Sequence, residues 1–222
     1  AQKQQLFNYL ENNYKPENRK YLYDFFYDNC ATKIRDVLST VTNNSITFEK
    51  PESFEPKTFR TLIYEHVNKN SWGSFGIDIA LGSVVDRQAS AKDFMFLPKY
   101  IHAFFEVSRI NGNEDLVKSS KVLYERKTDN SSSGFIFSPL VILGLLSVVI
   151  LFITYKDFKA QKRSKWLDVT LFSLTGIIGV LLLLLWFGTD HTATWQNYNL
   201  LWACPLNILA IRQLLKNDVK NW

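Results

Sequence analysis

Cys30 has the clearest capacity for chemistry of any residue in this sequence. It follows the aromatic and acidic stretch Tyr23–Asn29 and precedes a run with helical apolar spacing, Ile34 to Val41. In the first turn of a helix, free backbone N–H groups and the positive end of the helix dipole stabilise a thiolate and can help to form an oxyanion hole. The position therefore favours a thiol nucleophile that attacks a carbonyl carbon; a buried structural cysteine is the alternative.

Four neighbouring side chains are candidates for roles around this thiol. Asn29 can cap the helix, and together with Asp28 it could also position the nucleophile. Arg35 and Asp36 form either a support for the helix or a surface pair, and we favour the support. The second cysteine, Cys204, falls in or beside an apolar segment far along the chain, so we expect no disulfide between the two.

A cysteine nucleophile also needs a base, and the chain has 3 histidines. His66 and His102 fall on the apolar faces of expected helices, so we interpret both as core histidines with satisfied hydrogen bonds. His191 stands beside Asp190 in a polar loop next to an apolar segment. This pair could orient an imidazole or meet a lipid headgroup, and an ordinary polar loop is the alternative. The base therefore stays unassigned.

Several classes of site and protein are not supported by the sequence. It contains no spacing typical of metal ligands, no Gly-rich phosphate loop and no dinucleotide fingerprint, so we expect neither a metal nor a cofactor. Its 2 cysteines exclude a disulfide scaffold. The net charge of +5 does not indicate a nucleic-acid partner, because much of it comes from one short basic cluster and residues 1–130 are nearly neutral.

Two segments are long and apolar enough to cross a membrane. Residues 135–155 and 167–187 each provide the roughly twenty apolar residues that a spanning helix needs. A third apolar segment, 200–215, is interrupted by Pro205 and Arg212. We expect it to form a short or kinked span.

The chain thus divides into a soluble domain, residues 1–130, and a transmembrane domain, residues 131–222. The polar linker 130–134 marks the boundary. The loop 156–165 contains 5 Lys and Arg residues against 1 Asp, and short basic loops stay in the cytoplasm. This charge asymmetry predicts that residues 1–130 and the loop 188–199 lie on the opposite side of the membrane.

The soluble domain is expected to be mainly helical. Strand signal is too scarce for a full sheet within it. Residues 72–86 contain several glycines, which argue against a simple helix. We expect helices over residues 6–13, 30–41, 58–68 and, apart from Leu97-Pro98, 91–110. Residues 72–86 are expected to form a loop or a lining segment, and residues 117–124 a weak strand.

The residues around the thiol resemble the Lnb-type lipoprotein N-acyltransferases, a family typical of the Bacteroidetes. The most specific match is the block YLYDFFYDNCATKIRDVL, which contains Cys30. Further matches follow in order along nearly the whole chain: Phe59-Arg60, Trp72, Phe75–Asp78, Leu81-Gly82, Asp86, Phe96–Pro98, Phe137–Pro139, Trp186–His191, Asn197–Trp202 and Pro205–Asn207.

This resemblance implies a mainly α-helical membrane protein of the bacterial inner membrane. Its fold would be the helical, Cys-bearing part of a permuted papain-like (NlpC/P60-like) periplasmic α+β domain, followed by a transmembrane helical domain. In the family a histidine base, in a Phe-Gly-His-like motif, precedes the cysteine. That motif would lie upstream of Ala1, so we expect the N-terminal segment, and with it the base, to be absent from this chain.

The resemblance also implies a reaction. Cys30 would take an acyl chain from a phospholipid as a thioester and pass it to the α-amine of a diacylglyceryl lipoprotein, giving an N-acylated lipoprotein. The papain-like resemblance leaves a second class open, a periplasmic cysteine peptidase or amidase. A third possibility is a non-catalytic subunit of a larger inner-membrane complex.

Overall fold

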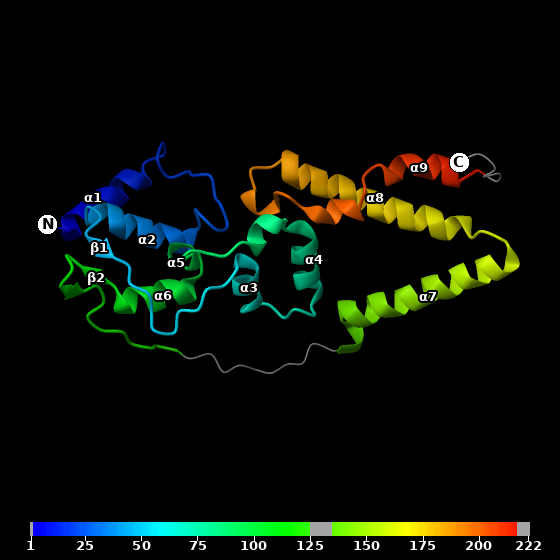
Figure 1. The fold of residues 1–222 in the computed structure, drawn as a ribbon. Helices are drawn as coiled ribbons and strands as arrows, with labels where there is room; N and C mark the ends of the chain where they lie inside the picture. The colour runs from blue at the N-terminus through cyan, green and yellow to red at the C-terminus, as the bar shows by residue number, and fades with distance from the viewer. Residues whose placement is uncertain (1, 125–134, 217–222) are drawn as a thin grey trace. The chain divides into compact units, whose positions relative to one another are not determined.

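The computed structural model describes residues 2–124 and 135–216, and it is mostly helical, as expected (Figure 1). The predicted linker 130–134 lies outside the described residues. The helices are α1 (Gln2–Tyr14), α2 (Cys30–Val41), α3 (Phe59–Tyr64), α4 (Trp72–Ala80), α5 (Ala91–Phe94), α6 (Pro98–Val107), α7 (Pro139–Ala160), α8 (Lys165–Phe187) and α9 (Asn207–Leu214). The strands are β1 (Ile46–Thr47), β2 (Arg109–Ile110) and β3 (Glu114–Asp115).

The chain folds into two compact units. The first contains Ala1–Leu62 and Asp86–Thr128, and the second contains Ile63–Val85 and Asp129–Trp222. The stretch Ile63–Val85 thus packs with the membrane half, although the sequence suggested a simple division at residue 130. Its hydrogen bonds to later parts of the chain, described below, explain this grouping.

The first unit is built on aromatic packing beneath α2. Helix α1 packs on α2, and α2 packs on α6. Phe26 lies with its ring centroid 4.7 Å from that of Phe59 and 5.1 Å from that of Phe96, and all three side chains are buried. Aromatic pairs of this kind stabilise a core beyond the area that they bury. The three packed rings form a rigid core next to the first turn of α2.

The only sheet among the described residues is small. Strand β2 pairs antiparallel with β1 and with β3, and Ile110 lies opposite both Ile46 and Glu114. The weak strand expected over 117–124 does not form, and this described segment carries no regular secondary structure. The scarcity of strand-forming sequence in the soluble half therefore predicted the small sheet correctly. The weak alternation of apolar and polar residues in 117–124 predicted a strand incorrectly.

Helix α4 forms where the sequence predicted a loop, so that prediction is wrong. The Ser71 hydroxyl accepts a hydrogen bond from the Ser74 N–H at 3.1 Å and caps the helix at its start. Gly76, one of the glycines that argued against a helix, lies in open space, where an added Cβ would meet no atom within 4 Å. The cap and the packing of the helix in the second unit outweigh the low helix propensity of glycine.

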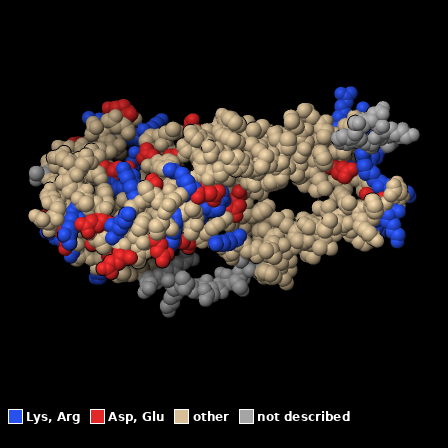
Figure 2. Space-filling model, in the orientation of Figure 1, with Lys and Arg blue, Asp and Glu red and all other residues tan. Residues whose placement is uncertain are grey.

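Helices α7 and α8 correspond to the first two predicted spans. They have 22 and 23 residues, and both are long and apolar enough to cross a membrane. Figure 2 shows the middle of both helices free of charged side chains on the face drawn, whereas Lys and Arg gather at the connection between them. This connection is an ordered turn, in which Asp157 accepts hydrogen bonds from the Ser164 N–H and hydroxyl.

The third apolar segment follows α8 in the reverse direction. The Thr194 hydroxyl donates to the Leu185 carbonyl at 2.8 Å, and the Arg163 guanidinium donates to the carbonyl of Leu214. Between these points Gly179 allows close approach, because a Cβ there would lie 2.1 Å from the Ala203 carbonyl oxygen. Helix α9 has only 8 residues, or about 12 Å of helix. A third crossing over 200–215 therefore stays a prediction.

Segment Ile63–Val85 is fastened to the loop that follows α8. The Asn197 side chain, which is 2% exposed, donates to the carbonyls of Ile79 and Ala80 at the end of α4. A Cβ at Gly82 would lie 1.7 Å from the Trp195 carbonyl oxygen, so only glycine permits this approach. These contacts hold the end of α4 against the loop.

Candidate active site around Cys30

Asn29 holds the first turn of α2 in place. Its side-chain oxygen accepts the N–H groups of Ala31 and Thr32 at 2.8 and 2.9 Å, and the Thr32 hydroxyl accepts the Asn29 N–H at 2.8 Å. Its side-chain nitrogen donates to the carbonyls of Phe25 and Phe96 at 2.8 and 2.9 Å. Asn29 is 5% exposed, and these bonds use its full hydrogen-bonding capacity. The predicted cap is confirmed, and its amide is occupied within the protein.

The same cap corrects one expectation about the oxyanion hole. The N–H groups of Ala31 and Thr32 are taken by the Asn29 side chain, so they do not face an incoming carbonyl. The backbone N–H of Cys30 makes no hydrogen bond to any residue in the described part of the chain. It remains as the donor next to the thiol, together with the positive end of the α2 dipole.

The Cys30 thiol is accessible. Cys30 is exposed and unpaired, and Cys204 is also a free cysteine, half-buried in the second unit. Both cysteines are free, in agreement with the expectation that they form no disulfide. The exposure of Cys30 excludes the alternative of a buried structural cysteine. The structure therefore presents a thiol to solvent at the first residue of a rigidly capped helix.

The acidic neighbours of Cys30 are held by cations. Asp28 lies 2.7 Å from the Lys33 ammonium, and this hydrogen bond raises the pKa of Lys33. The buried Arg35 binds Asp36 through two nitrogens, at 2.8 and 2.9 Å, and donates to the Lys92 carbonyl at 3.0 Å. Arg35 thus joins α2 to α5, which fits the support that we favoured for this pair.

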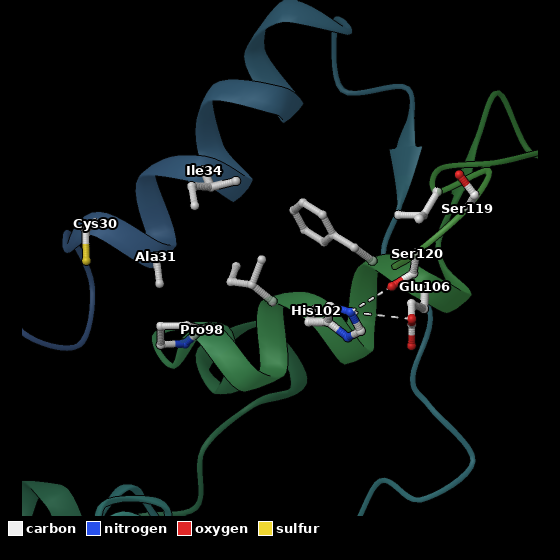
Figure 3. Close-up of a pocket in the computed structure, with 11 residues that line it drawn as sticks. Cys30, Ala31, Ile34, Pro98, His102, Glu106, Ser119 and Ser120 are labelled. Atoms are coloured by element: carbon white, nitrogen blue, oxygen red, sulfur yellow. Dashed lines mark hydrogen bonds and ion pairs between the residues drawn. The ribbon is translucent and has the colours of Figure 1, made fainter. Parts of the chain in front are cut away.

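A pocket of about 410 Å³ begins at Cys30 and lies between α2, α6 and the segment 117–120. Figure 3 shows Cys30 near one end of the drawn residues and Ser119 and Ser120 near the other. Its apolar walls come from Ala31, Ile34, Pro98, Ile101, Phe105 and Val117. The volume falls in the range of small-molecule sites.

His102 lies in this pocket and is not a core histidine, contrary to expectation. Its side chain is 62% exposed, and its Nε2 lies 3.2 Å from the Ser120 hydroxyl and 3.5 Å from a Glu106 carboxylate oxygen (Figure 3). His102 sits on the outer face of α6, because the buried face is taken by Ile101 and Phe104. The sequence pattern predicted that the ring lies on the buried face of the helix, whereas it lies on the exposed face.

The other two histidines are also exposed. His66 follows the end of α3 and is exposed, so its interpretation as a core residue is wrong. Asp190 and His191 lie in the second unit, in an exposed loop before a 3₁₀ turn at Thr192–Thr194. Within the described residues, no side chain hydrogen-bonds to the Cys30 thiol.

Tyr23 is a further candidate that the sequence did not single out. Partial desolvation raises the pKa of its hydroxyl, and negative charge on Cys30, Tyr21 and Asp24 raises it further. The hydroxyl therefore stays protonated at neutral pH, within electrostatic range of the thiol. Tyr23 lies outside any helix or strand, so no periodic pattern in the sequence relates it to Cys30. The bridge between Asp24 and Asp28 folds the stretch between the two residues back on itself.

Across the described residues, no group of three or more His, Cys, Asp or Glu side chains is arranged to hold a metal ion.

Two stretches of the chain match models of known protein domains. Residues 1–65 match the Lnb N-terminal periplasmic domain, and residues 129–222 match the Lnb transmembrane domain. No curated protein and no solved structure matches. The chain therefore belongs to the Lnb family, which indicates a membrane protein with a periplasmic domain, transmembrane helices and a role in modifying lipoproteins.

Proposed function

We propose that this protein is a membrane-bound lipoprotein N-acyltransferase that uses Cys30 as its nucleophile. The observation that carries the proposal is the placement of an exposed thiol at the first residue of α2, at the end of a largely apolar pocket. Acyl transfer needs a nucleophile that is held rigidly and a dry surface for the chain. The cap at Asn29 and the walls of the pocket supply these two requirements.

The reaction has two steps. In the first, the Cys30 sulfur attacks the ester carbonyl of a phospholipid, a C–S bond forms, the ester C–O bond breaks, and a lysophospholipid leaves with the proton of the thiol. In the second, the α-amine of a diacylglyceryl lipoprotein attacks the thioester carbonyl. An N–C bond forms, the C–S bond breaks, and the thiol regains a proton that the amine loses.

The first turn of α2 supports both tetrahedral intermediates. The free backbone N–H of Cys30 is positioned to donate to the developing oxyanion, and the helix dipole favours the thiolate. Asp28 forms an ion pair with Lys33, so its role is to fix the position of the residues that precede Cys30. Arg35 and Asp36 act as positioning residues that fix α2 against Lys92.

The membrane places both substrates near the enzyme. We place the periplasmic domain on the outer side of the inner membrane. The helix that begins at the nucleophile is a papain-like feature of this domain. The basic connection 156–165 then lies in the cytoplasm, and the loop 188–199, with Asp190 and His191, lies on the periplasmic side. Two substrates anchored in the same bilayer as the enzyme react at a high effective concentration. The acyl donor is a phospholipid and the acceptor is a lipoprotein.

This proposal is tested in cells whose lipoprotein N-acylation depends on the protein. Cys30→Ser should abolish N-acylation of lipoproteins, as measured by mass spectrometry of their N-terminal peptides. Cys204→Ser is the matched control, because it removes the other free cysteine, and N-acylation should continue. N-acylation that continues in the Cys30→Ser cells would show that the nucleophile is assigned wrongly.

A further inference from the structure

We infer that the pocket between α2, α6 and residues 117–120 binds the hydrocarbon tail of the acyl group carried by Cys30, and that its length limits the chains transferred. This inference rests on the proposed function. It adds a binding site and a basis for chain selection to a reaction that needs only a nucleophile and a base.

The chemistry of the walls selects a hydrocarbon. Side chains of Ile34, Ile101 and Phe105 line the pocket from two helices, and Val117 lines it from a third segment. Each methylene that leaves water for such walls contributes favourably to binding. A peptide would bring amide groups against these walls, and amides without partners are costly to bury. The pocket therefore fits an acyl chain better than it fits a peptide.

The two ends of the pocket give the chain a direction. Cys30 lies at one end, so the thioester carbonyl must sit there (Figure 3). At the other end, the His102 ring forms a hydrogen bond with the Ser120 hydroxyl and lies close to the Glu106 carboxylate. These polar groups are engaged with one another, and they offer an apolar tail no favourable contact. The tail therefore ends against the side chains of Phe105 and Val117.

Another groove in the first unit does not serve this role. It has a volume of about 490 Å³ and lies between α1 and α2, with both apolar and polar side chains in its lining. Cys30 is not among its lining residues, so an acyl chain held there would not be placed by the groove next to the thiol.

Filling the far end of the pocket tests the inference. In the full-length protein in detergent, Val117→Trp is compared with Lys118→Trp, which introduces the same side chain at an exposed neighbour that does not line the pocket. Each protein is incubated with an equimolar mixture of dipalmitoyl and dioctanoyl phosphatidylethanolamine. Mass spectrometry then gives the ratio of palmitoyl to octanoyl thioester on Cys30.

The expected result is a fall of about tenfold in this ratio for Val117→Trp, the factor expected when roughly two methylene groups lose their burial. Lys118→Trp should keep the wild-type ratio. Continued formation of the octanoyl thioester shows that Val117→Trp is folded. An unchanged ratio in Val117→Trp overturns the inference and leaves the proposed function intact, whereas wild-type protein that forms no thioester with either lipid contradicts the proposed function itself.

Discussion

The side-chain nitrogen of Asn29 donates a hydrogen bond to the carbonyl oxygen of Phe96 across 2.9 Å. This bond joins the turn before the candidate nucleophile to the connection between α5 and α6, which is distant in sequence. Asn29 also caps α2, so one buried side chain fixes both the start of the helix and its position on the aromatic core. The location of the Cys30 thiol depends on this residue more than on any direct contact of its own.

Replacement of Asn29 should therefore destabilise the first unit. Asn29→Ala removes the cap, at a cost of about 1–2 kcal/mol, and leaves the buried carbonyls of Phe25 and Phe96 without a donor. Asn29→Asp keeps an acceptor for Ala31 and Thr32 but turns a second oxygen toward those carbonyls, so it should not restore stability. Thermal unfolding of the purified protein measures both variants. An Asn29→Asp protein as stable as the wild type would contradict this account of the side chain.

Arg35 should resist even a conservative change. Arg35→Lys cannot reproduce the two bonds to Asp36 together with the bond to the Lys92 carbonyl. We expect a loss of about 1.5–3 kcal/mol, the range for hydrogen bonds of charged groups. Lys33→Met is the comparison, because the Lys33 side chain is 39% exposed and a surface ion pair contributes less than about 1 kcal/mol. Equal effects of the two changes on denaturant-induced unfolding would argue against a supporting role for Arg35.

The attachment of α4 in the second unit can be tested with two glycines. Gly82→Ala forces a Cβ into the Trp195 carbonyl oxygen, and overpacking of this kind costs about 1–3 kcal/mol. Gly76→Ala meets no atom within 4 Å, and alanine within a helix is more stable than glycine by roughly 0.5–1 kcal/mol. The melting temperature in detergent should fall for Gly82→Ala and stay or rise for Gly76→Ala. The opposite order would contradict the described packing of α4.

Tyr23 provides a spectroscopic test of the environment of the thiol. Because negative charge on Cys30 is one cause of the raised pKa of Tyr23, Cys30→Ser should lower that pKa. The pKa should still remain above its ordinary value, since desolvation is the larger cause. The difference between ultraviolet pH titrations with and without Tyr23→Phe isolates this phenol from the other tyrosines. A Tyr23 titration that is identical in the wild type and in Cys30→Ser would show that the two groups do not interact.

Much of the fold could be predicted because its signals are local. The apolar spans α7 and α8 follow from composition alone, and the start of α2 follows from Asn29 before a run with helical spacing. The position of Cys30 on the first residue of a helix is likewise a local property. These features agree with the sequence-based predictions because they depend on residues that are close together in the sequence.

The features that the sequence did not reveal depend on distant contacts. Helix α4 forms in spite of its glycines because the loop after α8 packs against its end, through Asn197 and Trp195. The exposure of His102 depends on which face of α6 meets the aromatic core. The four bonds of the Asn29 side chain include one to Phe96, and no local pattern predicts a partner 67 residues away.

The formation of an acyl thioester on Cys30 tests the central claim most directly. The full-length protein is incubated with a phospholipid in the absence of lipoprotein, and its peptides are analysed by mass spectrometry. The account predicts that the peptide containing Cys30 gains the mass of the acyl chain, that neutral hydroxylamine removes it, and that a diacylglyceryl lipopeptide accepts it. An acyl group that never appears on Cys30 while the same preparation N-acylates the lipopeptide would contradict the account.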